Sequence, residues 1–303
     1  MPDEHAPESA LEAGRELRGP QTPAAIAARE AVRSADPVPG SSKPDPILTV
    51  DGLVRRFGGL TAVDVGHLEV QRGVITAFIG PNGAGKTTLF NLITGFDTPD
   101  EGSWSFQGQP LAGKPPHAIA KSGMVRTFQL TKSLAKMSVI DNMKLGAQGQ
   151  VGESLLQALI PARWRSQERE IEERAEELLR RFNLIHMRDE YAATMSGGQR
   201  KLLEMARALM AEPDLILLDE PMAGVNPALV QSLLGHVEAL RDEGVSVLFI
   251  EHDMDVIMGI SDWIVVLGEG RLLAEGTPDD VAQNPMVIDA YLGTSFAQEN
   301  HDG

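Results

Sequence analysis

The chain has 303 residues, of which 42% are hydrophobic and 23% charged, and this balance excludes global disorder and allows a sizeable core. Its formal net charge of -16 argues against a nucleic-acid partner, and the absence of cysteine excludes disulfides, thiolate catalysis and cysteine-based zinc sites. The sequence contains neither an apolar run of membrane-spanning length nor signal-peptide features, so we expect any membrane role to depend on a partner.

Residues 1–46 contain many prolines and alanines and few large apolar residues. Such a composition buries too little apolar surface to offset the entropy of ordering, so it predicts a disordered tail. A short helix over 8–17 is the one element that the pattern allows there. At the other end, residues 294–303 are expected to be flexible.

Order is predicted to begin after Pro46. Apolar residues over 47–54 and 63–70 indicate two strands, with Gly58 and Gly59 as a turn between them. The short apolar run 74–79 is typical of a buried parallel strand.

A glycine-rich segment follows this buried strand and precedes a helical pattern over 89–93. This is the phosphate-binding loop pattern in its strand, loop and helix context. Its glycines let backbone N–H groups point inward at a helix N-terminus, where phosphate binds. Lys86 is predicted to bind the β- and γ-phosphates and Thr87 to ligate Mg²⁺. The predicted loop residues are Gly80, Pro81, Asn82, Gly83, Ala84, Gly85, Lys86, Thr87 and Thr88.

This motif indicates a nucleoside triphosphate and leaves kinases, GTPases, helicases and transporter ATPases open. The later apolar run 214–221 is predicted to form a strand that ends in the adjacent carboxylates Asp219 and Glu220. Because adjacent strand residues point to opposite sides, the two acids are predicted to act differently. Asp219 is expected to hold Mg²⁺, and Glu220 to orient and deprotonate the attacking water.

A second anion-binding helix start is predicted just upstream of that strand. Ser196, Gly197, Gly198 and Gln199 open a helical pattern that continues through Leu209, with Ser196 as a good N-cap. Together with the phosphate loop and the Asp-Glu strand end, this segment resembles the ATP-binding-cassette (ABC) family, whose signature is Ser-Gly-Gly-Gln.

The resemblance implies an α/β fold with a P-loop NTPase (RecA-like) core, an antiparallel β subdomain and an inserted α-helical subdomain. The ABC ATPase domain would cover 47–293, with the helical insertion at about 130–212. ATP and Mg²⁺ would be its ligands, and ATP hydrolysis its activity.

Further residues take roles only through this resemblance. Gln129 matches the glutamine that contacts Mg²⁺ and the attacking water, and His252 the switch histidine that contacts the γ-phosphate. Phe57 matches the aromatic residue that stacks on adenine, where the family often has tyrosine. Asn226 ends the loop that reaches the opposite subunit; the family commonly has Asp there, so trans communication is the property that this departure affects.

In the family, two cassettes pair head to tail and sandwich ATP between the phosphate loop of one and the signature of the other. The partners implied are a second ABC ATPase subunit, in a homo- or heterodimer, and transmembrane permease subunits, with 130–145 as the candidate groove for a permease helix. A periplasmic or extracellular binding protein would act indirectly. The expected location is the cytoplasmic face of the cell membrane.

The segments 126–129, 223–227, 250–258, 274–278 and 284–293 are similar to the branched-chain amino acid importer cassettes. This implies an ATPase subunit that powers uptake of branched-chain or related amino acids through a separate permease. Close relatives of that subgroup serve urea and short amides, and an exporter or lipid-transport cassette would share every ATP motif. These alternatives for the cargo stay open.

Overall fold

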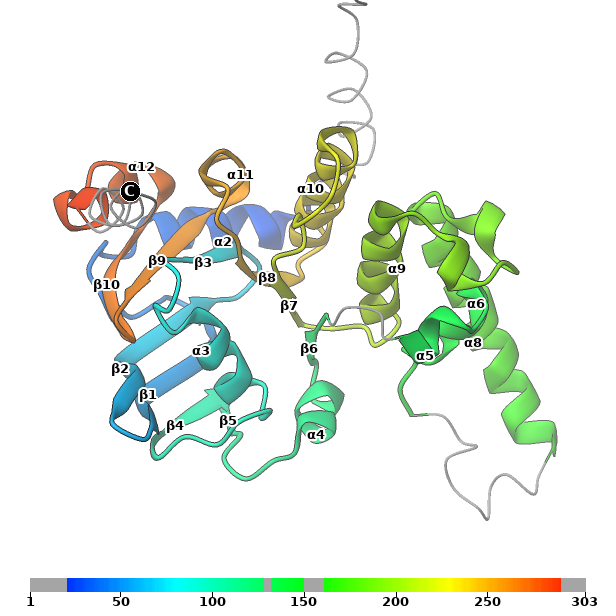
Figure 1. Cartoon of the computed structure of the whole chain (residues 1–303), viewed down its shortest axis with the longest axis horizontal. Helices are drawn as coiled ribbons and strands as arrows, with labels where there is room; N and C mark the ends of the chain where they lie inside the picture. The colour runs from blue at the N-terminus through cyan, green and yellow to red at the C-terminus, as the bar shows by residue number, and fades with distance from the viewer. Residues whose placement is uncertain (1–20, 128–131, 150–160, 290–303) are drawn as a thin grey trace, which may run out of the picture.

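The computed structural model describes residues 21–127, 132–149 and 161–289. Figure 1 shows two regions, one built on β-sheets and one made of helices, joined near the strands β6 and β7.

A mostly parallel sheet forms the centre of the strand-rich region. Its strand order is β10-β9-β3-β8-β7-β6, with β10 antiparallel to β9 and the other pairs parallel. The strands are β3 (Ile75–Ile79), β6 (Met124–Arg126), β7 (Leu215–Asp219), β8 (Ser246–Ile250), β9 (Trp263–Gly268) and β10 (Arg271–Gly276).

An antiparallel sheet, in the order β2-β1-β4-β5, lies beside it. The strands predicted over 47–54 and 63–70 are confirmed but longer, because the hairpin ladder continues to the pair Phe57 and Leu60 at the Gly58 turn. Gly58 has φ +59, a left-handed conformation that glycine adopts without strain. The strands are β1 (Pro46–Phe57), β2 (Leu60–Gln71), β4 (Glu101–Phe106) and β5 (Gln109–Pro110).

The central parallel strands are apolar throughout because they face two separate cores. In β8, Val247 and Phe249 pack in one apolar cluster while Leu248 and Ile250 pack in the other. The second cluster fills the space between the sheets and includes Phe90 from the helix that follows the glycine-rich loop. A strand buried on both faces reads as a continuous apolar run, as predicted for 74–79.

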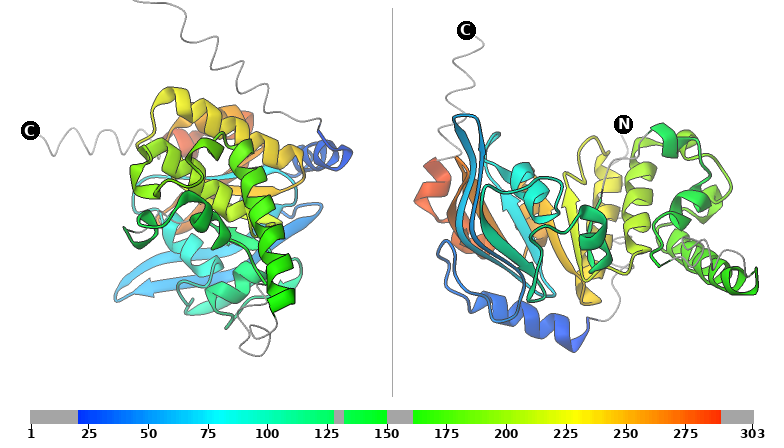
Figure 2. Two further views of the ribbon diagram at one scale, coloured as in Figure 1. Left: turned by 90° about the vertical axis from the view of Figure 1, so that its right-hand side faces the viewer. Right: turned by 90° about the horizontal axis from the view of Figure 1, so that it is seen from below.

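Helices cover the parallel sheet and form the second region (Figure 2). Within the described residues, no helix has both the length and the apolar character needed to span a membrane. The sheet region carries α3 (Lys86–Ile93), α4 (Pro116–Lys121), α10 (Pro227–Asp242), α11 (Met254–Ile260) and α12 (Pro278–Ala282). The helical region, between β6 and β7, carries α5 (Lys132–Ala135), α6 (Val139–Lys144), α8 (Pro161–Arg181), α9 (Gly197–Leu209) and the 3₁₀ turns η2 (Ile185–Met187) and η3 (Ala192–Thr194).

The prediction of a disordered tail over 1–46 is wrong for its second half. Residues 23–33 form helix α2 (Pro23–Arg33), which packs on the sheet region, and Thr22 caps it by accepting a hydrogen bond from Ala25 N at 3.2 Å. Arg29 pairs with Asp262 at 2.8 Å, and the buried Lys43 pairs with Glu275 at 3.2 Å. Polar pairs with distant residues, which composition does not reveal, order this segment. The helix expected over 8–17 and the end at 294–303 lie outside the described residues.

Candidate active site

The carboxyl ends of neighbouring parallel strands bring the predicted site residues to one edge of the sheet. The glycine-rich loop follows β3, Asp219 ends β7, and His252 follows β8, and these strands are adjacent. This edge is where open α/β sheets bind ligands. Gln129, which follows β6 in the sequence, lies outside the described residues.

The loop between β3 and α3 has the conformation that its glycines were predicted to allow. Gly80 has φ +145, and a Cβ there would lie 2.1 Å from the Leu267 carbonyl oxygen. Gly85 has φ +97, and its Cβ would lie 2.4 Å from the Ala62 carbonyl oxygen. Only glycine fits at either position, so the surrounding backbone fixes the course of the loop.

The side chain of Lys86, the first residue of α3, reaches back to this loop. Its Nζ donates hydrogen bonds to the carbonyl oxygens of Gly80, at 2.7 Å, and Pro81, at 3.1 Å. Burial lowers the pKa of Lys86, while the carboxylates of Glu220 and Asp219 oppose that shift. The lysine is thus a half-buried cation at the N-terminus of α3, where phosphate oxygens are favoured.

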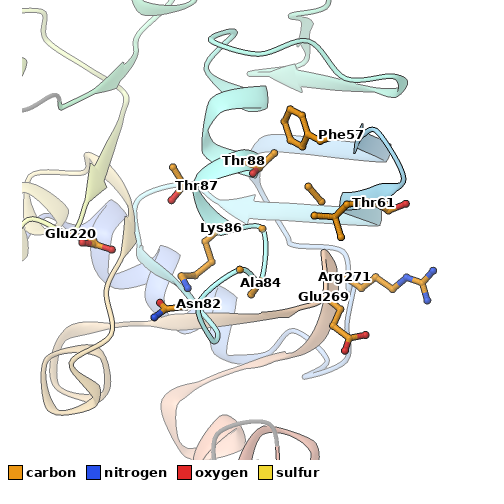
Figure 3. Close-up of a pocket in the computed structure, with 14 residues that line it drawn as sticks. Phe57, Thr61, Asn82, Ala84, Lys86, Thr87, Thr88, Glu220, Glu269 and Arg271 are labelled. Atoms are coloured by element: carbon orange, nitrogen blue, oxygen red, sulfur yellow. The ribbon is translucent and has the colours of Figure 1, made fainter. Parts of the chain in front are cut away.

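A cavity of about 860 Å³ opens over the loop (Figure 3). Glu220 lies at one end and Phe57 at the other, with Lys86 between them. Phe57 is 48% exposed, and the Arg55 guanidinium lies 4.7 Å from its ring centroid. An exposed aromatic ring at the mouth of a phosphate-binding cavity can stack on a planar base.

The lining of this cavity includes residues that the sequence analysis missed, notably Glu269 and Arg271. They flank Gly270 in the turn between β9 and β10. The N–H of Gly270 donates a hydrogen bond to the Ala84 carbonyl oxygen at 3.1 Å. The turn therefore supports the loop from below. The available signal in the sequence was the glycine between two apolar strand patterns. It indicates a turn but does not indicate that this turn packs against the phosphate loop.

Asp219 and Glu220 were predicted to point to opposite sides of a strand, and this is wrong. Strand β7 ends at Asp219, and Glu220 has φ +47, in the left-handed region that few residues other than glycine adopt. The chain turns there, so both carboxylates line one smaller cavity of about 360 Å³. Its lining residues are Thr87, Arg126, Thr127, Lys201, Glu204, Asp219 and Glu220.

Arg126 holds the Asp219 carboxylate in place. Its side chain is 8% exposed, and its Nη2 donates to Asp219 Oδ2 at 2.6 Å while its Nη1 donates to Asn91 Oδ1 on α3 at 2.6 Å. Hydrogen bonds from a charged donor are stronger than neutral ones, so these two contacts, to separate partners, hold the guanidinium in place. In the sequence, Arg126 belongs to the segment 126–129 that is similar to the importer cassettes, but no local pattern assigns it a role.

Thr87 and Asp219 offer a hydroxyl and a carboxylate oxygen to the same small cavity. These hard oxygen donors suit Mg²⁺, which takes few protein ligands and fills its shell with water and phosphate oxygens. Among the residues that the structure describes, no group of three or more His, Asp or Glu side chains could hold a metal alone. The donor set therefore fits a magnesium ion that arrives with a nucleotide.

His252 lies beside Glu220, with its Nδ1 3.7 Å from Glu220 Oε1. Both side chains are about half exposed, at 59% and 46%. The structure thus brings the predicted switch histidine next to the predicted general base.

The Ser196 to Gln199 segment opens α9 in the helical region. Ser196 Oγ accepts from Gln199 N at 3.2 Å, and Gln199 Oε1 accepts from Ser196 N at 2.9 Å, which is a capping box. A Cβ on Gly198 would lie 1.8 Å from Leu229 Cδ2 of α10, so that glycine permits close packing. Within the described ranges, residues 196–199 do not line either cavity, so one chain does not bring the two anion-binding helix starts together.

Asn226 is the N-cap of α10. Its Oδ1 accepts a hydrogen bond from Leu229 N at 2.9 Å, a cap that Asp would make equally well. The departure from Asp therefore leaves the helix start intact and removes a charge.

Comparison with known families agrees with this arrangement. The family described as "ABC transporter" matches residues 63–223, and the one described as "Branched-chain amino acid ATP-binding cassette transporter" matches residues 271–297.

Individual relatives extend the match over most of the chain. The probable branched-chain amino acid transport ATP-binding protein LivG of Archaeoglobus fulgidus is 42% identical over 83% of this chain and 97% of its own length. The high-affinity branched-chain amino acid transport ATP-binding protein BraF of Pseudomonas aeruginosa is 44% identical over 82% of this chain and 98% of its own. The crystal structure of the ADP conformation of an ATP-binding cassette of an ABC transporter has a TM-score of 0.71 and 37% identity, covering 82% of this chain and 99% of that one. The chain therefore belongs to the ATP-binding-cassette family of transporter ATPases, among the cassettes that include LivG and BraF.

Proposed function

We propose that the chain is the ATP-hydrolysing subunit of an importer for branched-chain amino acids and that its site works through the residues described above. One observation carries the proposal for the site: Lys86, Thr87 and Glu220 line one continuous cavity around the phosphate loop. A half-buried cation, a hydroxyl and a carboxylate are the groups that phosphoryl transfer requires.

The chemistry assigned to each residue follows from its place. The residues of the loop, 80–88, with Lys86, bind the phosphates, and Phe57 stacks on the adenine. Glu220 accepts a proton from the attacking water as its oxygen bonds to the γ-phosphorus and the bond to the β-phosphate oxygen breaks, which yields ADP and phosphate. His252, beside Glu220, is assigned to the γ-phosphate, and Gln129 to the water and the metal.

Magnesium, when bound, neutralises charge on the β- and γ-phosphate oxygens. Thr87 and Asp219 are the residues assigned to hold it, and Arg126 keeps the Asp219 carboxylate turned toward the cavity. Asp219 thus needs no reorganisation when the nucleotide arrives.

The separation of the two helix starts supports a head-to-tail dimer. Ser196, Gly197, Gly198 and Gln199 of a second subunit, with its Asn226 loop, would close the cavity that one chain leaves open. An isologous pair encloses two nucleotides about one two-fold axis. Nucleotide binding then holds the subunits together, and hydrolysis releases them.

A groove between the sheet region and the helical region supports docking of a permease. It has a volume of about 410 Å³, and Leu134 and Leu145, both within the segment 130–145, line it together with Ala120 and Ala208. An apolar groove between two regions suits an amphipathic helix of a membrane partner. Docking there would place this subunit at the cytoplasmic face of the membrane, with a binding protein acting on the far side of the permease.

The cargo is proposed from the relatives. LivG and BraF are named for branched-chain amino acid transport, and the sequence model matched at 271–297 carries the same description. Because the cargo does not contact this subunit, the identity of the cargo has to be tested in the complete transporter.

The variant Glu220→Gln tests the site assignment. The amide is close in size to the carboxylate but cannot accept the proton, so we expect ATP hydrolysis to fall at least about a hundredfold. ATP binding is expected to persist, and because the nucleotide is not consumed, the variant should accumulate as an ATP-bound dimer in gel filtration.

Glu168→Gln is the matched control, because Glu168 is an exposed acid on α8, away from both cavities. It is expected to hydrolyse ATP at the unmodified rate. Hydrolysis by Glu220→Gln within a few fold of this control would overturn the assignment of Glu220 as the base.

A further inference from the structure

Glu251 is a buried acid between strand β8 and His252, and it has no role in the function proposed above. The residue is 3% exposed. Burial raises the pKa of its carboxyl group, while hydrogen bonds from the Met222 and His252 N–H groups oppose the shift. A buried carboxylate close to a second one, Glu220, is costly, so its contacts need an explanation.

The Glu251 side chain bridges two segments of the site. Its Oε1 accepts a hydrogen bond from Met222 N at 2.8 Å, and its Oε2 accepts one from His252 N at 3.3 Å. Met222 lies in the loop that runs from Glu220 to Asn226. Each carboxylate oxygen accepts one of these N–H groups, whereas an amide in the same place would turn its NH₂ group toward one of the two donors.

This bridge stands where the strand ladder stops. The parallel pairing of β7 with β8 ends at Asp219 and Ile250, and Glu220 N donates to Ile250 O at 3.0 Å. Beyond that point the left-handed turn at Glu220, with φ +47, carries the chain away from the ladder. The Met222 N–H then donates to the Glu251 carboxylate instead of a strand carbonyl, so this side chain continues the connection between the two segments.

We propose that Glu251 is a positioning residue that holds Glu220 and His252 in register and ties both to the 220–226 loop. The Nδ1 of His252 and Oε1 of Glu220 are 3.7 Å apart, on either side of this bridge. A movement of His252 on contact with a γ-phosphate would thereby be transmitted through Glu251 to the 220–226 loop, which faces the opposite subunit in the proposed dimer. The proposal rests on the assignment of Glu220 as the base.

The variant Glu251→Gln tests it in the full-length chain. The amide keeps one acceptor, and its NH₂ group would face a second donor. We expect kcat for ATP hydrolysis to fall roughly tenfold while the Kd for ATP, measured by calorimetry, changes less than twofold. Glu251→Asp, which is one methylene shorter and cannot span both N–H groups, is expected to lose activity as well and serves if Glu251→Gln does not fold. A wild-type kcat in the folded variant overturns the proposal.

A double-mutant cycle with His252→Ala separates positioning from a general loss of stability. If Glu251 acts through the alignment of His252 and Glu220, Glu251→Gln should lower kcat by a smaller factor in the His252→Ala background than in the wild-type chain. Rates that fall by the product of the two single effects would show independent roles and overturn the proposal, as would a His252→Ala variant with wild-type kcat.

Glu275→Gln is the matched control, because it also removes a buried carboxylate, but one that pairs with Lys43 away from the site. It should lower the thermal midpoint without lowering kcat per folded molecule. The two assignments can be overturned separately. An active Glu220→Gln variant would overturn the assignment of Glu220 as the base. An inactive Glu220→Gln variant together with a fully active Glu251→Gln variant would overturn only the positioning role of Glu251.

Discussion

His236 shows how a single buried residue makes stability depend on pH. Its imidazole is 2% exposed and stacks on the Phe182 ring, with centroids 4.1 Å apart and an interplanar angle of 23°. Burial, aided by the nearby Arg181 charge, lowers its pKa to about 4. The native state therefore contains neutral His236 at pH values where an unfolded chain binds a proton.

We expect the free energy of unfolding to decline as the pH falls through the window from 6.5 to 4, by about 1.4 kcal/mol per unit, and to be independent of this group above it. Between pH 7 and pH 5 the loss is about 2 kcal/mol. His236→Phe keeps the ring stack and removes the titration, so urea unfolding of that variant should show a smaller loss over the same range. His186→Phe, at an exposed position, is the control and should retain the wild-type slope. Equal pH slopes for His236→Phe and wild type would contradict the prediction.

Individual residues of the site differ in how far the sequence predicted them. The strand, loop and helix around Lys86 were predicted from a local pattern, and the structure has β3, the loop and α3 there. Arg126 and Glu251 were missed because their partners, Asp219 and Met222, are distant in the sequence and no periodic pattern marks such pairs. The left-handed turn at Glu220 could not be predicted either, since it is a departure from local propensity that the surrounding structure imposes.

At the scale of elements, the apolar strands were predicted well and the N-terminal segment was not. Because successive residues of a central strand are buried in two different cores, every position of the strand is apolar. Such a continuous apolar run is a strong sequence signal for a buried strand. Residues 21–45 instead depend on contacts such as Arg29 with Asp262, which brings together residues 233 positions apart. The segment has few buried apolar side chains, among them Val32, so its composition resembles a disordered tail.

Lys43 is the centre of this anchoring. Its Nζ donates to Glu275 Oε2 at 3.2 Å and lies 4.5 Å from the Trp263 ring centroid. Glu275 also accepts hydrogen bonds from Ser41 N at 2.7 Å and Trp263 Nε1 at 3.1 Å. Both partners of the ion pair are fully buried, so removing one leaves the other charge without compensation.

We therefore expect Lys43→Met to lower the free energy of unfolding by about 3 to 5 kcal/mol. The double variant Lys43→Met, Glu275→Gln should recover part of this loss, because no charge is then left buried alone. Chemical denaturation is the measurement, and Lys114→Met, at an exposed lysine, is the control. A Lys43→Met variant as stable as this control would show that the segment is not anchored through the pair.

At the scale of the whole molecule, the site and the proposed docking groove share a wall. Arg126, Thr127 and Glu204 line both the groove and the small cavity at Asp219. A helix seated in the groove would therefore rest against the residues that position Asp219. Under the proposed function, this shared wall is a route by which events at a permease change ATP hydrolysis.

Coupling through the groove would make ATP hydrolysis depend on the cargo of the complete transporter. In vesicles that contain the permease, this ATPase and the binding protein, leucine should stimulate ATP hydrolysis several fold, whereas the isolated chain should not respond to it. The stimulus must travel through the groove, because this subunit has no proposed contact with the amino acid. Glu220→Gln in the same complex is the control and should show no stimulation. If urea or a short amide stimulates hydrolysis and leucine does not, the proposed cargo is wrong. The ATPase assignment would still stand, because the phosphate loop and its carboxylates act on ATP whichever solute the permease carries.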